Sequence, residues 1–297
     1  MLSELAKYIY TDDGVKLTYF VLPCPGASYT LVMLHGLASN HSRWSEFINH
    51  TQLSNYMNLL TMDLRGHAGS MTQNRKIGHK AWIKDLHKIL QKESLDKIIL
   101  VGHSMGAQLA LHYAEAYPHS VSGLMLIDPT IPKELRGKLA VARRLRFLLW
   151  LAVVMFLFAS KFKTSKKTYP FYDLHELDLK TRERMISESV DVIAKLYTSP
   201  GEDLKYLPLV NYLQDLYAVT SPLPDLSKIK CPTRVLLSKS SSIVNPANMK
   251  AYFSNKAGLD ILSVDANHWP LTERPDECRQ AIDEWCLKLL NSQLKKI

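Results

Sequence analysis

The chain has 297 residues, of which 46% are hydrophobic and 22% are charged. This balance is typical of one large folded domain, or of a core with an insertion, and it excludes a disordered chain and a small disulfide-stapled one. The net charge of +9 is not spread out, because residues 133–167 hold ten basic side chains and one acid while the rest holds 27 of each. A charge confined to one segment, without an aromatic reader motif, argues against nucleic acid as a partner.

Short apolar runs alternate with helical patterns along the chain. Strands are predicted at 7–11, 17–22, 30–36, 59–64, 98–103, 121–128, 233–238 and 260–264, and helices at about 41–54, 78–93, 105–117 and from about 275. The run from Ile98 to Val101 is continuously apolar, as in a central strand covered on both faces. This alternation predicts an α/β fold, with a mostly parallel sheet and flanking helices.

The middle of the chain differs from the two ends. Residues 132–225 carry the basic segment, an apolar run at 147–159, and amphipathic helical patterns around 180–197 and 203–218. Strand patterns return only at 233. We therefore predict a core made of residues 1–131 and 226–297, with residues 132–225 inserted as a mostly helical unit.

Four cysteines, at positions 24, 231, 278 and 286, are scattered and form no CxxC pair. This spacing predicts no metal site and a reduced, cytoplasmic setting. The first residues lack the apolar run of a secretory signal, and no apolar stretch reaches the ~20 residues of a membrane-spanning helix.

The strongest motif is Gly102-His103-Ser104-Met105-Gly106, which lies between a predicted strand and a predicted helix. Gly-x-Ser-x-Gly in this context is a nucleophile elbow, a strained turn whose glycines let the strand and the helix approach closely. Ser104 is therefore the predicted nucleophile. The N–H of Met105, at the helix N-terminus, is a predicted donor to an oxyanion.

Here the sequence resembles the α/β-hydrolase superfamily. His35-Gly36 follows the third strand, Asp63-Leu-Arg-Gly-His-Ala-Gly-Ser70 follows the fourth, and Ala266-Asn-His-Trp-Pro follows the last. The resemblance implies a second oxyanion donor at Leu37 N–H and a catalytic base at His268. It implies a structural role for Asp63 and Arg65, which we expect to hold that loop by an ion pair or a turn bond.

The triad acid departs from the usual pattern of the family. The position that normally carries the carboxylate, after the seventh strand, is Ser241, and no Asp or Glu occurs between Asp225 and Asp260. The superfamily also uses the end of the sixth strand, where this chain has Asp128. We predict that Asp128 orients His268, although capping of the strand before Pro129 would also explain it.

The inserted unit is predicted to be a cap over the nucleophile. Its run from Phe147 to Ala159 has no polar face, so it must be covered by the core, by a second subunit or by lipid. The flanking cations suit peripheral contact with an anionic membrane. An anionic head group held by Arg143, Arg144 and Arg146 is a third reading.

The predicted function is that of a serine esterase or lipase, which cleaves hydrophobic carboxylic esters through an acyl-enzyme without a metal or cofactor. The alternatives are a related thioester or carbon–carbon bond hydrolase, and a weakly active or inactive protein that binds a ligand or a membrane. The empty acid position at Ser241 motivates the last of these.

Overall fold

The computed structural model describes residues 4–162, 167–188, 197, 199–254 and 258–294. Its strands are β1 (Leu5–Tyr10), β2 (Lys16–Leu22), β3 (Thr30–Leu34), β4 (Asn58–Met62), β5 (Ile98–His103), β6 (Val121–Ile127), β7 (Thr233–Ser240) and β8 (Leu259–Asn267). They form one sheet in the order β1-β2-β4-β3-β5-β6-β7-β8. Only the pairs β1–β2 and β2–β4 are antiparallel. The mostly parallel sheet expected from the sequence is confirmed.

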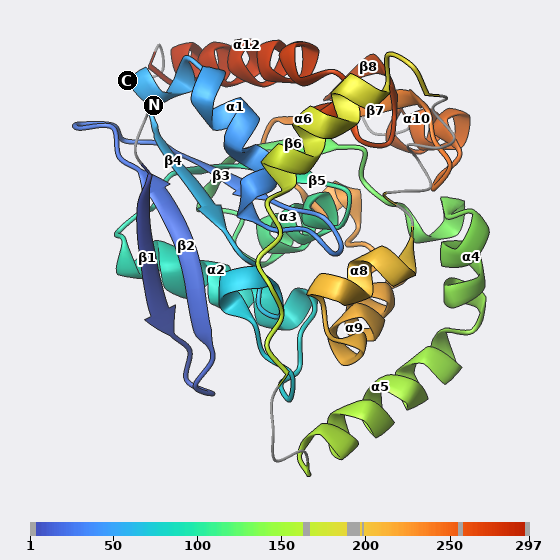
Figure 1. The fold of residues 1–297 in the computed structure, drawn as a ribbon. Helices are drawn as coiled ribbons and strands as arrows, with labels where there is room; N and C mark the ends of the chain where they lie inside the picture. Colours follow the sequence, from blue (N-terminus) through green and yellow to red (C-terminus); the bar gives the residue numbers. More distant parts are fainter. Residues whose placement is uncertain (1–3, 163–166, 189–196, 198, 255–257, 295–297) are drawn as a thin grey trace.

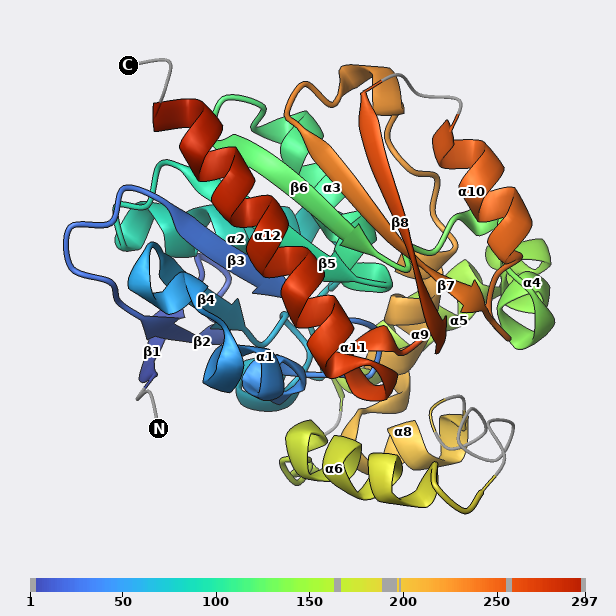
Figure 2. The same cartoon turned by 90° about the horizontal axis from the view of Figure 1, so that it is seen from above.

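Helices cover both faces of this sheet, as Figures 1 and 2 show. One face carries α1 (Ser45–His50) and α12 (Pro275–Leu294), and the other carries α2 (His79–Lys92), α3 (Met105–Ala116) and α10 (Pro246–Ser254). Strand β5 contributes to both hydrophobic clusters, because Ile98 and Leu100 face one and Ile99 and Val101 face the other. This double burial explains its uninterrupted apolar sequence.

The helix expected at 41–54 is broken into shorter pieces. A 3-10 turn at His41–Trp44 leads into α1, and a second turn follows at Leu53–Asn55. Thr51 separates them in an extended conformation, with its Oγ1 accepting the Leu53 N–H at 3.1 Å. The threonine hydroxyl replaces a helical hydrogen bond, and such competition ends helices at β-branched polar residues.

A helical segment separates β6 from β7. It contains α4 (Gly137–Arg144), α5 (Arg146–Ser160), α6 (Leu174–Arg184), α8 (Pro200–Tyr206) and α9 (Leu209–Val219). Helix α9 packs against α3, α4 and α5 and so joins the segment to the sheet. Part of the amphipathic pattern expected at 180–197 lies outside the described residues. The division at 132 and 225 into core and cap stays a prediction.

Helix α5 lies at the edge of the molecule, outside α9 (Figure 1). One expectation from the sequence was that the rest of the chain covers this apolar helix. Within the described residues that cover is absent on its outer half, because only Val153 of α5 is buried. Phe147 is 69% exposed and Phe158 is 62% exposed. Among the described residues, the core therefore covers the inner side of this helix but not its outer half.

The first turn of α3 lies unusually close to the backbone of two strands. A Cβ added at Gly102 would meet the Gly106 carbonyl oxygen at 2.3 Å, and one added at Gly106 would meet the Leu34 carbonyl oxygen at 2.3 Å. Both obstacles are backbone atoms, which cannot move aside as a flexible side chain does. Glycine is therefore required at both positions.

We predict that Gly106→Ala lowers the free energy of unfolding by about 3 kcal/mol or more, because α3 must shift away from β3 to admit the methyl group. The matched control is Gly201→Ala, whose Cβ would lie 3.8 Å from the Ser199 hydroxyl. It should stay within about 1 kcal/mol of the parent. Urea unfolding followed by circular dichroism measures both, and equal stabilities for the two variants would contradict the steric argument.

Candidate active site

The turn between β5 and α3 places Ser104 at the carboxyl edge of the sheet. Its backbone is left-handed, with φ 55° and ψ −113°, a conformation that a serine adopts only where the surroundings impose it. The close packing at Gly102 and Gly106 supplies that constraint. The side chain is mostly buried yet lines a pocket. The predicted elbow therefore has the geometry expected of a nucleophile turn.

His268 directly follows β8 and points at the serine. Its Nε2 lies 3.2 Å from Ser104 Oγ, within hydrogen-bond distance, although the two residues are 164 positions apart. The His268 carbonyl accepts a hydrogen bond from His103 Nε2 at 2.8 Å, which fixes the loop from the residue beside the nucleophile. Burial lowers the pKa of His268 well below its usual range, and His103 lowers it further. The imidazole is therefore neutral and ready to accept a proton.

Asp128 follows β6, the strand beside β5, and faces the other ring nitrogen of His268. The distance from Asp128 Oδ2 to His268 Nδ1 is 3.9 Å, longer than a hydrogen bond, and Nδ1 has no hydrogen-bond partner among the described residues. Asp128 instead accepts the Ser238 N–H at 2.7 Å and the Ser238 hydroxyl. Burial raises the pKa of Asp128 to about 7. The predicted acid therefore lies next to the histidine, but its hydrogen bonds come from Ser238.

Ser241 occupies the position at which the family resemblance led us to expect the acid, and its hydroxyl accepts hydrogen bonds within the local turn. It accepts the N–H groups of Ile243 and Val244 at 3.1 and 3.2 Å. A serine in this role stabilises the chain reversal after β7 and carries no charge toward the histidine. Of the two acid positions weighed from the sequence, only that of Asp128 brings a carboxylate near His268.

The two predicted oxyanion donors belong to segments next to Ser104: Met105 follows it in the chain, and Leu37 lines the same pocket. Met105 is the first residue of α3, and the first N–H groups of a helix have no partner within it. Leu37 lines the pocket and precedes Ala38, whose left-handed φ of 49° turns the loop after β3. Beneath this loop His35 donates from Nδ1 to the Gly36 carbonyl at 2.8 Å and accepts the Leu64 N–H at Nε2. Burial lowers the pKa of His35 to about 3, so it acts as a neutral scaffold.

The loop after β4 is held by one of the two expected contacts, a turn bond from the Gly69 N–H to Asp63, and by partners from elsewhere. Asp63 and Arg65 do not pair with each other. Asp63 accepts from His41 and from the Gly69 N–H, whereas Arg65 binds the carboxylates of Asp85 and Asp13. Their structural role is as expected. The Asp63–Gly69 contact lies within the loop, and the other partners come from three other segments.

A pocket of about 420 Å³ opens above Ser104. Its walls combine loops of the sheet edge with α4, α6, α8 and α9, and they include the polar residues Tyr172, Tyr197, Glu202, Asp203, Tyr206 and Tyr212. Burial raises the pKa of Asp203 to about 7. Of the described lining residues, none comes from α5, so the apolar run does not form the pocket roof that a cap helix would. The sequence pointed to a hydrophobic substrate and did not single out these tyrosines.

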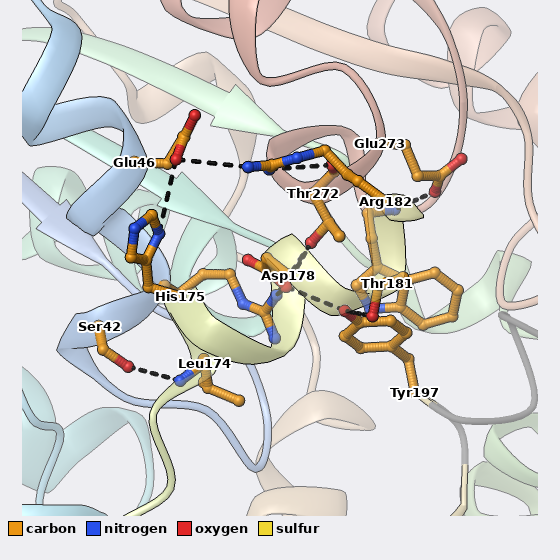
Figure 3. A network of polar contacts seen from close by, with 12 residues as sticks. Ser42, Glu46, Leu174, His175, Asp178, Thr181, Arg182, Tyr197, Thr272 and Glu273 are labelled. Carbon is orange, nitrogen blue, oxygen red and sulfur yellow. Dashed lines mark hydrogen bonds and ion pairs between the residues drawn. The ribbon is translucent and has the colours of Figure 1, made fainter. Parts of the chain in front are cut away.

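A buried polar network around Asp178 joins the helical segment to the residues that follow His268, and Figure 3 shows its Asp178–Thr272 bond. Arg43, from the turn before α1, pairs with Asp178 of α6 and donates to the Thr272 hydroxyl at 2.9 Å. Tyr197 and Thr272 also donate to Asp178, at 2.9 and 3.0 Å. Thr272 belongs to α11 (Pro270–Glu273), which follows His268 directly. No motif marks Arg43 or Asp178, because their partners are distant in sequence.

The described residues bear on two questions, a metal site and a membrane-spanning helix. They contain no cluster of three or more histidine, cysteine or acidic side chains arranged to hold a metal ion. Among the same residues, no helix combines the length and the apolarity needed to span a bilayer.

Comparison with known proteins identifies the family to which this fold belongs. A family model described as the alpha/beta hydrolase fold matches residues 29–275, and the chain therefore belongs to the α/β-hydrolase family. The sn-1-specific diacylglycerol lipase of Danio rerio is 31% identical over 118 residues, 40% of this chain and 37% of that lipase. This match spans less than half the length of that lipase.

Longer matches are more distant. The monoacylglycerol lipase of Mus musculus is 22% identical over 301 residues, covering all of this chain and 86% of that protein. The solved structure of an E-2-(acetamidomethylene)succinate hydrolase has a TM-score of 0.67 at 17% identity, and covers 95% of this chain and 98% of its own. That likeness shows the fold alone. The family thus includes lipases among the relatives of this chain, together with hydrolases of other named substrates.

We predict that Asp178→Ala lowers the free energy of unfolding by about 3–5 kcal/mol, because the buried Arg43 guanidinium loses its carboxylate. Glu176→Ala on the same helix is the control, since Glu176 pairs with Lys180 at the exposed surface. That pair should contribute under about 1 kcal/mol. Urea unfolding of both variants measures the difference, and a loss below about 1 kcal/mol for Asp178→Ala would show that the buried pair is not needed.

Proposed function

We propose that this protein is a serine hydrolase that cleaves carboxylic esters of hydrophobic, acyl-bearing substrates through an acyl-enzyme intermediate. The observation that carries the proposal is the 3.2 Å approach of His268 Nε2 to Ser104 Oγ at the tip of a strained strand–helix turn. A nucleophile within hydrogen-bond distance of a neutral base is the arrangement that acyl transfer requires.

In the proposed reaction, His268 Nε2 removes the Ser104 proton as Oγ attacks the ester carbonyl carbon. The carbonyl oxygen becomes an oxyanion, which the N–H groups of Leu37 and Met105 receive. The intermediate collapses, the C–O bond to the alcohol breaks, and His268 returns its proton to the leaving oxygen. Water, deprotonated by His268, then attacks the acyl carbon. The bond from that carbon to Ser104 Oγ breaks, His268 gives its proton to Oγ, and the carboxylic acid leaves. Asp128 orients the ring and stabilises the imidazolium formed in each step.

The pocket walls support an ester with one apolar and one polar part. Apolar side chains such as Leu177, Leu216 and Ile243 suit an acyl chain, whereas the tyrosines and Asp203 offer partners for hydroxyl groups. Relatives named as acylglycerol lipases support the same substrate class. Cys24, Cys278 and Cys286 form no disulfide, which fits our proposal of a cytoplasmic location.

A second candidate, a protein that keeps the fold and turns over slowly, is favoured by one observation. Asp128 is bonded to Ser238, and His268 Nδ1 lies 3.9 Å away from it. An acid that does not hold the imidazole leaves a slower serine–histidine pair. Catalytic hydrogen bonds are, however, often long before substrate binds. Thioester or carbon–carbon bond hydrolysis would use the same pair, and a substrate series distinguishes those reactions.

We predict that a fluorophosphonate probe labels the protein at Ser104 and that Ser104→Ala abolishes both labelling and hydrolysis of p-nitrophenyl esters. His268→Ala should reduce the labelling rate about as severely, because the serine loses its base. His119→Ala is the control, since His119 is exposed in the turn after α3, at the opposite end of that helix from Ser104. Labelling at another residue, or none on folded protein, would refute the proposal.

We also predict that kcat/KM on a short ester rises with pH through about 7. Below this pH the Asp128 carboxyl is protonated and cannot accept the Nδ1–H of His268, because burial holds its pKa near 7. His268 itself stays neutral over this range. In Asp128→Asn the rate should fall by orders of magnitude and the step near pH 7 should vanish. A step that persists in this variant would assign the titration to His268 instead.

A further inference from the structure

The outer half of α5 is an apolar surface without a cover among the described residues. Seven of its side chains are between 43% and 69% exposed: Phe147, Leu148, Trp150, Leu151, Val154, Met155 and Phe158. Isolated exposed apolar residues are ordinary, but a contiguous group on one helix marks an interaction site. We call these seven residues the α5 face.

The α5 face is one side of a helix whose opposite side packs against the protein. Phe147, Leu151, Val154 and Phe158 follow the spacing of one helical stripe, flanked by the other members. On the opposite side Val153 is buried, and the helix packs against α9. Arg146 also faces inward, donating to the Ser221 hydroxyl at 2.8 Å and lying 3.9 Å over the ring of Tyr217. One half of the helix is thus anchored in the protein, and the other half is presented outward.

Positive charge surrounds the α5 face. Arg143 and Arg144 end α4, and Lys161 follows α5; all three are exposed, and within the described part of the chain none lies within ion-pair distance of a carboxylate. The sequence has no acidic residue between Glu134 and Asp173. The partner that complements this surface is therefore apolar in its interior and negatively charged at its boundary.

We propose that the α5 face docks this protein on an anionic membrane surface. Cations beside the helix would meet lipid phosphates while the aromatic and aliphatic side chains enter the interface. With 15 residues, α5 is about 22 Å long, shorter than the ~30 Å hydrocarbon core, so it lies along the surface and does not cross it.

A second copy of the chain is a poorer occupant of this surface. In a two-fold dimer the same patch meets itself, so the cations that flank α5 would face those of the partner. Residues 133–167 carry all of the +9 net charge of each copy, and no acidic group of that segment other than Glu134 could offset it. An anionic lipid layer instead attracts these cations, whereas a second copy repels them.

Helices α4 and α9 contact α5 and also contribute residues to the pocket wall. Helix α4, which leads into α5, begins with Gly137, Lys138 and Leu139 in the pocket wall, and α9, on which α5 rests, contributes Leu216 and Val219. Docking through α5 would therefore bring the pocket near the lipid layer. This last step rests on the proposed function, whereas docking itself does not.

The experiment is flotation of the full chain with phosphatidylcholine vesicles, with and without phosphatidylglycerol. The parent should float with the anionic vesicles and much less with the neutral ones. The triple variant Phe147→Ser, Leu151→Ser, Phe158→Ser should lose binding by about tenfold or more. The triple variant Arg143→Gln, Arg144→Gln, Lys161→Gln should lose about fivefold for each charge removed, and only with anionic vesicles.

Matched controls remove comparable groups elsewhere. Tyr8→Ser, Tyr10→Ser and Tyr56→Ser alter side chains that are 54–61% exposed, and Lys80→Gln, Lys84→Gln and Lys92→Gln remove three cations from α2. Neither set should change flotation. Hydrolysis of a short, water-soluble ester should be unchanged in both α5-region variants, because none of the six altered residues lines the pocket.

Three results would overturn the proposal: no flotation, equal flotation with both kinds of vesicle, or controls that weaken binding as much as the α5-region variants. Sedimentation of the parent and of the apolar variant decides the competing occupant, since a dimer that the serine substitutions dissociate would assign the α5 face to a second copy. Absence of ester hydrolysis in every form would refute the proposed function and leave the flotation result intact.

Discussion

The close approach of α3 to the backbone of β3 and β5 is the constraint on which the site depends. Gly102 and Gly106 leave no room for a methyl group, so the chain between them is forced into a left-handed turn with Ser104 at its tip. The same approach buries the first turn of the helix beneath the nucleophile. Sheet packing and chemistry are therefore linked, since the contact that seals the core also aims the hydroxyl.

Burial at this edge of the sheet moves two ionisable groups in opposite directions. It raises the pKa of Asp128 and lowers that of His268, so each is driven toward its neutral form when the pocket is empty. Ser238 stabilises the carboxylate in the meantime by two hydrogen bonds. The ion pair between imidazolium and carboxylate would become favourable only as Ser104 gives up its proton. The charged pair of His268 and Asp128 therefore forms only while a substrate reacts.

The fold and the Ser104–His268 pairing were predictable because their signals are local: apolar strands, a strand–turn–helix motif and a loop after the last strand. The contacts of Asp128 were less accessible, since its bond to Ser238 depends on the register of β6 and β7. Arg43 and Asp178, 135 positions apart, carry no sequence signal at all. The hydrophobic pattern of α5 was visible, but whether protein or solvent meets it depends on packing that a pattern does not encode.

The insertion between β6 and β7 also has a consequence for how the chain folds. Asp128 and Ser238 are 110 positions apart, so β7 can pair with β6 only after the whole helical segment has been made. Closing so long a loop is slow, and until it closes the hydrogen-bonding edge of β6 stands open. At that stage the chain contains Ser104 but not yet His268. An unpaired strand edge and an exposed apolar helix are features that favour aggregation of a partly folded chain.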